Sequence, residues 1–149
     1  MHQSITNFTN IQNSIKENQE KTNNKNNIKI IAVSKTFEIS HINPLIDYGH
    51  TDFGENKVQE AIEKWSDIKI KNQNLSLHLV GKLQSNKTKL ALKIFDYIHS
   101  LDSEKLANRI SEEQKKIDKK PKLFIQVNIG NENQKSGVNP NKLKLFHKY

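Results

Sequence analysis

The chain has 149 residues, no cysteine and a formal net charge of +8. This length suffices for the core of one ordinary domain, and the lack of cysteine excludes a disulfide framework and a thiolate metal site. The sequence contains no apolar run long enough to cross a membrane and its N-terminus is polar, so we expect a cytoplasmic protein without a membrane partner.

The positive charge does not indicate a nucleic-acid partner. Lysines are spread along the whole chain, Arg109 is the single arginine, and asparagine is abundant. A protein that reads duplex DNA is expected to place arginines on one face, where they reach base edges. We attribute the excess of Lys, Asn and Ile to codon bias and expect no nucleic-acid binding. A basic nucleic-acid-binding module remains the third of three functional hypotheses.

The N-terminal segment, residues 1–27, begins as an amphipathic helix. Ile5, Phe8, Ile11 and Ile15 fall on one helical face. The polar, Asn-rich stretch that follows them predicts a loop.

The first strand is predicted at 28–34, within the sequence I-K-I-I-A-V-S-K-T. Its short, nearly continuous apolar run is typical of a strand buried on both faces, as in a parallel sheet. Lys35 follows directly, between Ser34 and Thr36. The carboxyl end of such a strand is where α/β folds carry their chemistry, while the ordinary alternative is a lysine that only reaches solvent.

Four more predicted strands alternate with helices along the rest of the chain. The strands are expected at 51–55, 75–80, 97–101 and 123–129. The helices are expected to begin at Ser40, Asn56, Ser85 or Asn86, and Ser103, with a last one after Pro140. This alternation predicts stacked β–α–β units, one parallel sheet and a single α/β domain over 1–149.

Right-handed crossovers place the carboxyl ends of all parallel strands on one rim of the sheet. Polar residues follow or end each predicted strand: Lys35, Asn56, residues 78–81, residues 100–102 and Asn128. Two of these have ordinary structural interpretations. Asn56 could cap the following helix, bind a ligand, or do both, and for His78 a hydrogen-bonded core histidine is favoured over a catalytic base.

Four segments on this rim resemble motifs of the pyridoxal-phosphate homeostasis proteins, single-domain relatives of the alanine racemase N-terminal barrel. They read A-V-S-K-T (32–36), F-G-E-N-K-V-Q-E (53–60), H-L-V-G-K-L-Q-S-N-K (78–87) and Q-V-N-I-G-N-E-N-Q-K-S-G (126–137). They occur in order and at the right spacing, and the resemblance runs from about Ile28 to Pro140.

The resemblance implies a TIM-type (β/α) barrel that holds pyridoxal 5′-phosphate (PLP) as a Schiff base on Lys35. It implies that Asn56 faces the cofactor ring and that Lys135 is a secondary lysine able to take up an aldehyde. The implied function is PLP binding in vitamin B6 homeostasis, without turnover, so no catalytic residue and no metal ligand is assigned. The alternative is a PLP-dependent racemase-like enzyme, which would need a tyrosine base from elsewhere, or a non-functional fragment of one.

The number of predicted strands is smaller than such a barrel requires. A TIM-type barrel has eight strands and about 200 residues or more, and its phosphate site follows the last two strands. Here five strands are predicted, and the family's late segments are not found. We therefore expect a partial barrel, the N-terminal portion of a family member, with PLP binding impaired. Its open sheet edges predict self-association.

Overall fold

The computed structural model describes residues 2–130 and 132–149. Its elements, in chain order, are α1 (Gln3–Thr22), β1 (Ala32–Val33), α2 (Ile39–Asp47), β2 (Asp52–Glu55), α3 (Val58–Lys71), β3 (Ser76–Leu79), the 3₁₀ turn η1 (Ser85–Lys87), α4 (Thr88–Ile94), β4 (Tyr97–Leu101), α5 (Glu104–Gln114), β5 (Lys122–Ile125), the 3₁₀ turn η2 (Pro140–Lys142) and α6 (Leu143–Lys148). All neighbouring strands pair in parallel, in the order β1-β2-β3-β4-β5. The α/β class, the five strands and the N-terminal helix are confirmed.

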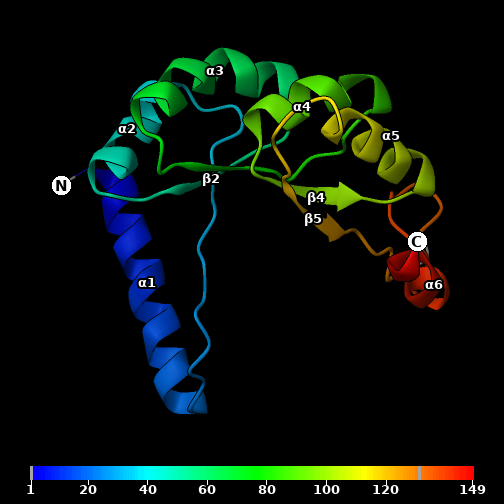
Figure 1. Cartoon of the computed structure of the whole chain (residues 1–149). Helices are drawn as coiled ribbons and strands as arrows, with labels where there is room; N and C mark the ends of the chain where they lie inside the picture. Colours follow the sequence, from blue (N-terminus) through cyan, green and yellow to red (C-terminus); the bar gives the residue numbers. More distant parts are fainter. Residues whose placement is uncertain (1, 131) are drawn as a thin grey trace.

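The helices that connect the strands lie on one side of the sheet. Figure 1 shows α3, α4 and α5 above the strands, with α1 extending away from one end of the sheet and α6 lying at the other. The core forms between this helical layer and the sheet. Its fully buried members are Phe53, Leu77, Leu79 and Ile98 from the strands and Ala61, Trp65, Ala91, Leu92 and Ile110 from the helices.

The opposite side of the sheet, which we call the open face, carries no helix within the part of the chain that the structure describes. Val33, Gly54, His78 and Tyr97 pair in one row across it. Side chains alternate between the two faces of a strand, so this row lies opposite the core residues. Val33 is 46% exposed. The prediction that the first strand is buried on both faces is therefore wrong, because its second face borders the open side of an unclosed sheet.

Two predicted boundaries at the N-terminus also differ from the structure. Helix α1 runs through the polar stretch to Thr22 and ends where Asn23 adopts a left-handed conformation (φ +49°). Lys, Glu and Gln are good helix formers, so this stretch extends the helix although it buries nothing. The first strand shortens to Ala32–Val33.

Only one of the predicted helix caps is used. The backbone N–H of Leu106 donates to Ser103 Oγ at 3.3 Å, as expected. Ser40 instead lies inside α2, α3 begins after Lys57 rather than Asn56, and Ser85–Lys87 form a 3₁₀ turn. Apolar side chains that dock each helix on the sheet fix these starts, so a capping side chain is not needed.

No helix within residues 2–130 and 132–149 combines the length and the apolar character needed to span a bilayer.

Candidate functional site

Lys35 lies in a tight turn directly after β1. The backbone N–H of Phe37 donates to the Ser34 carbonyl at 3.2 Å, which closes the turn, and Thr36 has a left-handed φ of +66°. The Lys35 side chain is exposed and its amine has no hydrogen-bond or ion-pair partner among the described residues. The turn thus presents a free primary amine at the carboxyl end of the sheet.

The left-handed Thr36 is a strained element of this turn. A β-branched residue in this region costs about 1–2 kcal/mol relative to its usual conformations. Thr36→Gly should therefore raise the free energy of unfolding by up to about 1 kcal/mol, after allowance for the greater freedom of glycine in the unfolded chain. Denaturant melts of Thr36→Gly and of Thr36→Ala, which keeps the Cβ, measure this. A loss of stability in the glycine variant would show that Thr36 is not strained.

A buried polar network lies beneath the turn, on the helical side of the sheet. Glu55 is fully buried, and its Oε1 accepts hydrogen bonds from Ser34 Oγ (2.8 Å), Lys64 Nζ (2.9 Å) and Trp65 Nε1 (3.0 Å). Lys64 Nζ also donates to the Ser34 carbonyl at 2.9 Å. The carboxylate is compensated by a cation and two further donors, the condition under which a buried charge is tolerated.

This network holds the two residues that directly precede the candidates Lys35 and Asn56. Ser34 precedes Lys35, and Glu55 precedes Asn56. Ser34 and Glu55 are thereby anchored on the helical side at the carboxyl ends of β1 and β2, directly before the turn that holds Lys35 and the bend that holds Asn56. The structure thus brings Lys35 and Asn56 to the ends of adjacent strands.

The position of Asn56 depends on Gly81, the residue that follows the end of β3. A Cβ built on Gly81 would lie 2.2 Å from the Asn56 carbonyl oxygen and 2.8 Å from its Cα, so no other residue fits without a shift. The Asn56 side chain makes no hydrogen bond within the described part of the chain and does not cap α3, whose N-cap is Lys57. The capping interpretation is wrong, and the amide remains available to a ligand.

Lys135 lies far along the sheet from Lys35. It belongs to the loop after β5, the opposite edge strand from β1. Its Nζ pairs with Glu132 Oε1 at 2.6 Å, and it lines a hollow of about 390 Å³ together with Val80, Gln126 and Asn128. The structure therefore does not bring Lys135 to Lys35.

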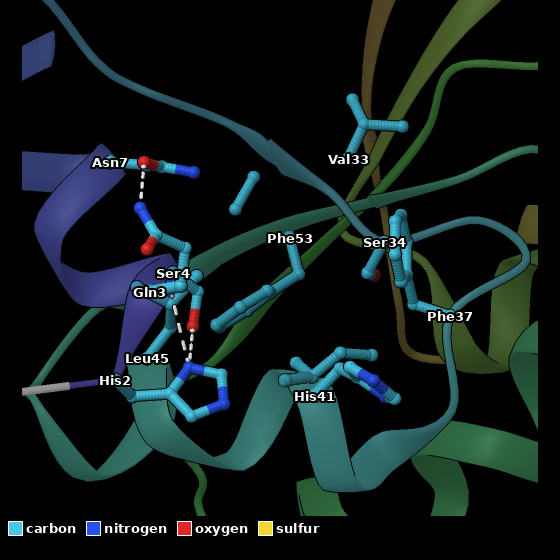
Figure 2. A pocket seen from close by; sticks show the side chains of 12 residues that line it. His2, Gln3, Ser4, Asn7, Val33, Ser34, Phe37, His41, Leu45 and Phe53 are labelled. Atoms are coloured by element: carbon cyan, nitrogen blue, oxygen red, sulfur yellow. Dashed lines mark hydrogen bonds between the residues drawn. The ribbon is translucent and has the colours of Figure 1, made fainter.

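A second hollow lies between α1, α2 and β1, and nothing in the sequence patterns indicated it. Figure 2 shows the Phe53 ring of β2 directed toward His2 and Ser4 of the N-terminal segment, with Ser34, Phe37 and His41 on its other side, while the Val33 side chain points away. Its volume is about 300 Å³ and its walls are mainly apolar. It adjoins the turn, but Lys35 is not among its lining residues.

A polar cluster on the open face was also missed. Asp52 Oδ1 lies 2.7 Å from Lys29 Nζ and 3.1 Å from His78 Nε2, and His78 Nδ1 lies 3.0 Å from His99 Nε2. His78 is thus the hydrogen-bonded core histidine that the sequence favoured. Asp52 and His99 could have been found from the same two-residue alternation that places His78 on this face.

The cluster has a defined electrostatic state. Burial lowers the pKa of His78, which the Asp52 carboxylate opposes without reversing. Burial and the neighbouring His78 lower the pKa of His99. Burial raises the pKa of Asp52, but hydrogen bonds from Lys29, His78 and Thr51 outweigh it and leave that pKa below its usual value. At neutral pH the cluster holds one carboxylate and two neutral imidazoles.

These directions predict a pH dependence of stability. His50, His78 and His99 all have pKa values lowered by burial, so the unfolded chain binds protons more readily than the folded one as the pH falls. Stability is then fully present above about pH 7 and is lost as the pH falls through the unfolded value of about 6.5. Urea unfolding at pH 7.5 and 5.5 measures this. Greater stability at pH 5.5 would contradict the buried, neutral state of these histidines.

The comparisons with known proteins agree with the motif resemblance found in the sequence. Residues 7–148 match the family described as "Alanine racemase, N-terminal domain". The "Pyridoxal phosphate homeostasis protein" of Haemophilus influenzae is 42% identical over 132 residues, which cover 88% of this chain and 55% of that protein. That of Pasteurella multocida is 43% identical over 116 residues, 78% of this chain and 50% of that protein. The chain spans about half the length of the curated relatives it matches.

A solved structure resembles the chain closely. The structure of PipY of Synechococcus elongatus with PLP bound superposes with a TM-score of 0.73 at 35% identity, covering 89% of this chain and 61% of that one. The first relative and this structure both align with close to nine-tenths of the residues present here. Because the family match extends over nearly the whole sequence, the chain belongs to the alanine racemase N-terminal domain family.

Proposed function

We propose that this chain binds PLP through Lys35 and acts in PLP homeostasis. The observation that carries the proposal is the free, exposed amine of Lys35, held at the carboxyl end of the sheet by the buried Ser34–Glu55 contact. A primary amine without an ion-pair partner is free to add to an aldehyde. Lys35 would hold the cofactor through this amine: its nitrogen would form a C=N bond with the aldehyde carbon, and the carbonyl oxygen would leave as water.

The residues around Lys35 fit this cofactor in part. The free Asn56 amide at the end of the adjacent strand can donate to an oxygen substituent of the ring, which supports its role as a binding residue. Lys135 is a weaker candidate, because its amine is already paired with Glu132. We assign it as a secondary site that is loaded only at higher PLP concentration.

We propose a carrier without turnover rather than a racemase-like enzyme. Racemisation needs a second base opposite the lysine. The ring of Tyr48 packs edge-on against Phe8, that of Tyr97 is stacked on His78 (ring centroids 4.2 Å apart), and Tyr149 donates to Asn108; none of the three has a contact with Lys35 among the described residues. Deuterium exchange at the α-carbon of L- and D-alanine, with PLP present, decides between the two: no exchange supports the carrier, and exchange above free PLP supports the enzyme.

The binding proposal is tested by absorbance titration with PLP. The wild-type chain should develop the visible band of the C=N bond, Lys35→Ala should lose most of it, and Lys57→Ala, which removes an exposed lysine, should not. A small residual band that disappears in the Lys35→Ala/Lys135→Ala double variant would identify the secondary site. An unchanged band in Lys35→Ala would overturn the proposal.

We also propose that the open sheet associates with a second copy of the chain. Both edge strands, β1 and β5, lack a second neighbour within the described residues, and Val33 and Phe124 are 46% and 49% exposed. Unpaired strand edges and apolar faces favour such association. Light scattering should show a mass that rises with concentration, and Phe124→Lys should reduce it. A monomer at all concentrations would contradict the proposal.

A further inference from the structure

The open face carries a hydrogen-bond chain that the proposed covalent bond does not use. It runs from Asp52 on β2 through His78 on β3 to His99 on β4, with heavy-atom distances of 3.1 Å and 3.0 Å. The His78 side chain is 2% exposed and that of Asp52 is 9% exposed. Aromatic rings hold both imidazoles in place: His78 stacks on Tyr97 and His99 on Phe124, with centroids 4.2 and 4.6 Å apart.

The chemistry of the three groups determines which atom donates and which accepts in each of these two hydrogen bonds. An ionised carboxylate only accepts hydrogen bonds, so His78 must present N–H at Nε2 to Asp52. A neutral imidazole carries one proton, so Nδ1 of His78 is an acceptor and His99 must donate to it from Nε2. His99 is thereby fixed with its proton on Nε2 and a lone pair on Nδ1, which has no partner among the described residues.

Strand register places His99 toward the carboxyl end of the sheet, the end at which Lys35 lies. Val33, Gly54 and Tyr97 belong to one row across the sheet. His99 comes two residues further along β4, toward its carboxyl end and on the same face, and Lys35 and Asn56 lie the same number of residues further along the chain, in the turn and the bend that follow β1 and β2. His78 belongs to the same row as Val33, Gly54 and Tyr97, and Asp52 lies at the amino end of β2, two residues before Gly54. The hydrogen bonds from Asp52 through His78 to His99 therefore run toward the carboxyl end of the sheet, where Lys35 lies.

We propose that His99 is a ligand-binding residue of this site, whose Nδ1 accepts a hydrogen bond from a donor group of the PLP held at Lys35. Asp52 and His78 are positioning residues that keep the His99 proton on Nε2 and so leave Nδ1 free. This inference rests on the proposed function for the identity of the ligand, but the fixed tautomer does not depend on it.

The charged surroundings agree with a neutral His99. Lys29, from the segment before β1, pairs with Asp52. Lys29 and Lys122 of β5 both lie over the Tyr97 ring, at 5.6 and 5.3 Å from its centroid. Asp96, before β4, raises the pKa of His78, but burial outweighs it and leaves that pKa below its usual value. Burial lowers the pKa of both histidines, Lys29 adds to this effect at His78 and His78 adds to it at His99, so the neutral imidazole is the state that meets the ligand.

The tautomer is measured by ¹⁵N–¹H correlation spectra of the histidine rings in the full chain at neutral pH. His99 should show its proton on Nε2 alone, whereas the exposed His147 serves as an unconstrained reference. In His78→Phe, which keeps the ring stacked on Tyr97 but removes both nitrogens, His99 should become a mixture of tautomers. If that variant does not fold, Asp52→Asn serves the same purpose. A wild-type His99 that is mixed, or protonated on Nδ1, overturns the proposal without any variant.

The ligand contact is measured by PLP titration of His99→Phe, which retains stacking on Phe124 but cannot accept a hydrogen bond. Affinity should fall about threefold to tenfold, the worth of one hydrogen bond, while the C=N band still forms on Lys35. His147→Phe should bind as the wild type does. Equal affinity in His99→Phe and wild type would overturn the inference, whereas a wild type that forms no C=N band would overturn the proposed function instead.

Discussion

Glu55→Ala should destabilise the chain by about 3–5 kcal/mol, because it removes the carboxylate that pairs with the mostly buried Lys64 and accepts hydrogen bonds from two buried donors. The Lys64 side chain is only 15% exposed and loses its carboxylate partner. Ser34 Oγ and Trp65 Nε1 lose the hydrogen bonds that Glu55 Oε1 accepts. A loss of this size is a large part of the stability of an ordinary domain, so the variant should be largely unfolded near physiological temperature.

Two variants show whether the buried ion pair causes this loss. Glu55→Gln keeps an acceptor for Ser34 and Trp65 but removes the charge, and should cost less than the alanine variant. Glu60→Ala breaks an exposed pair with Lys57 and should cost less than about 1 kcal/mol. Denaturant unfolding compares all three. If Glu55→Ala costs no more than Glu60→Ala, the network beneath Lys35 does not hold the site.

Gly81→Ala should both destabilise the fold and disturb ligand binding. The new methyl group would lie 2.2 Å from the Asn56 carbonyl oxygen, which belongs to the backbone and cannot rotate away. Overpacking of this kind costs about 1–3 kcal/mol. The chain at Asn56 must shift, so the variant should also hold PLP more weakly than wild type while Lys35 still reacts.

The matched control is Gly130→Ala. Its added Cβ would meet only the flexible side chain of Glu132, the nearest atom being Oε1 at 3.1 Å. This variant should keep stability within about 0.5 kcal/mol, as is usual for a surface change. Thermal melts and PLP titrations of both variants measure the two effects. Normal PLP affinity in a destabilised Gly81→Ala variant would show that Gly81 does not contribute to PLP binding.

The number of strands and their parallel arrangement were predictable because apolar runs bounded by polar segments recur along the chain and alternate with helical patterns. The strands predicted at 51–55, 75–80 and 97–101 match β2, β3 and β4 to within a residue or so at each end. Among the helix starts, Ser103 was predicted correctly, but Ser40 and Asn56 have the chemistry of caps while tertiary docking places the helix boundaries elsewhere. Capping propensity is local, and packing overrides it.

The site was predictable only in part for a similar reason. Motif resemblance identified Lys35, Asn56 and Lys135 as candidates one at a time. Which of them lie together follows from strand order, which puts β1 beside β2 and β5 at the far edge. The hydrogen bonds of Asp52 and His99 span three strands, and such long-range contacts leave no signature in any single segment.

The central claim, that Lys35 carries the cofactor, is tested most directly by locating the attachment. Borohydride reduction fixes PLP on whichever lysine it has bound, and peptide mass spectrometry after proteolysis identifies that residue. With PLP below the protein concentration, the modified peptide should be the one containing Lys35, and Lys135 should be modified only when PLP is in excess. Label spread evenly over the exposed lysines, or found first on Lys135, would contradict it.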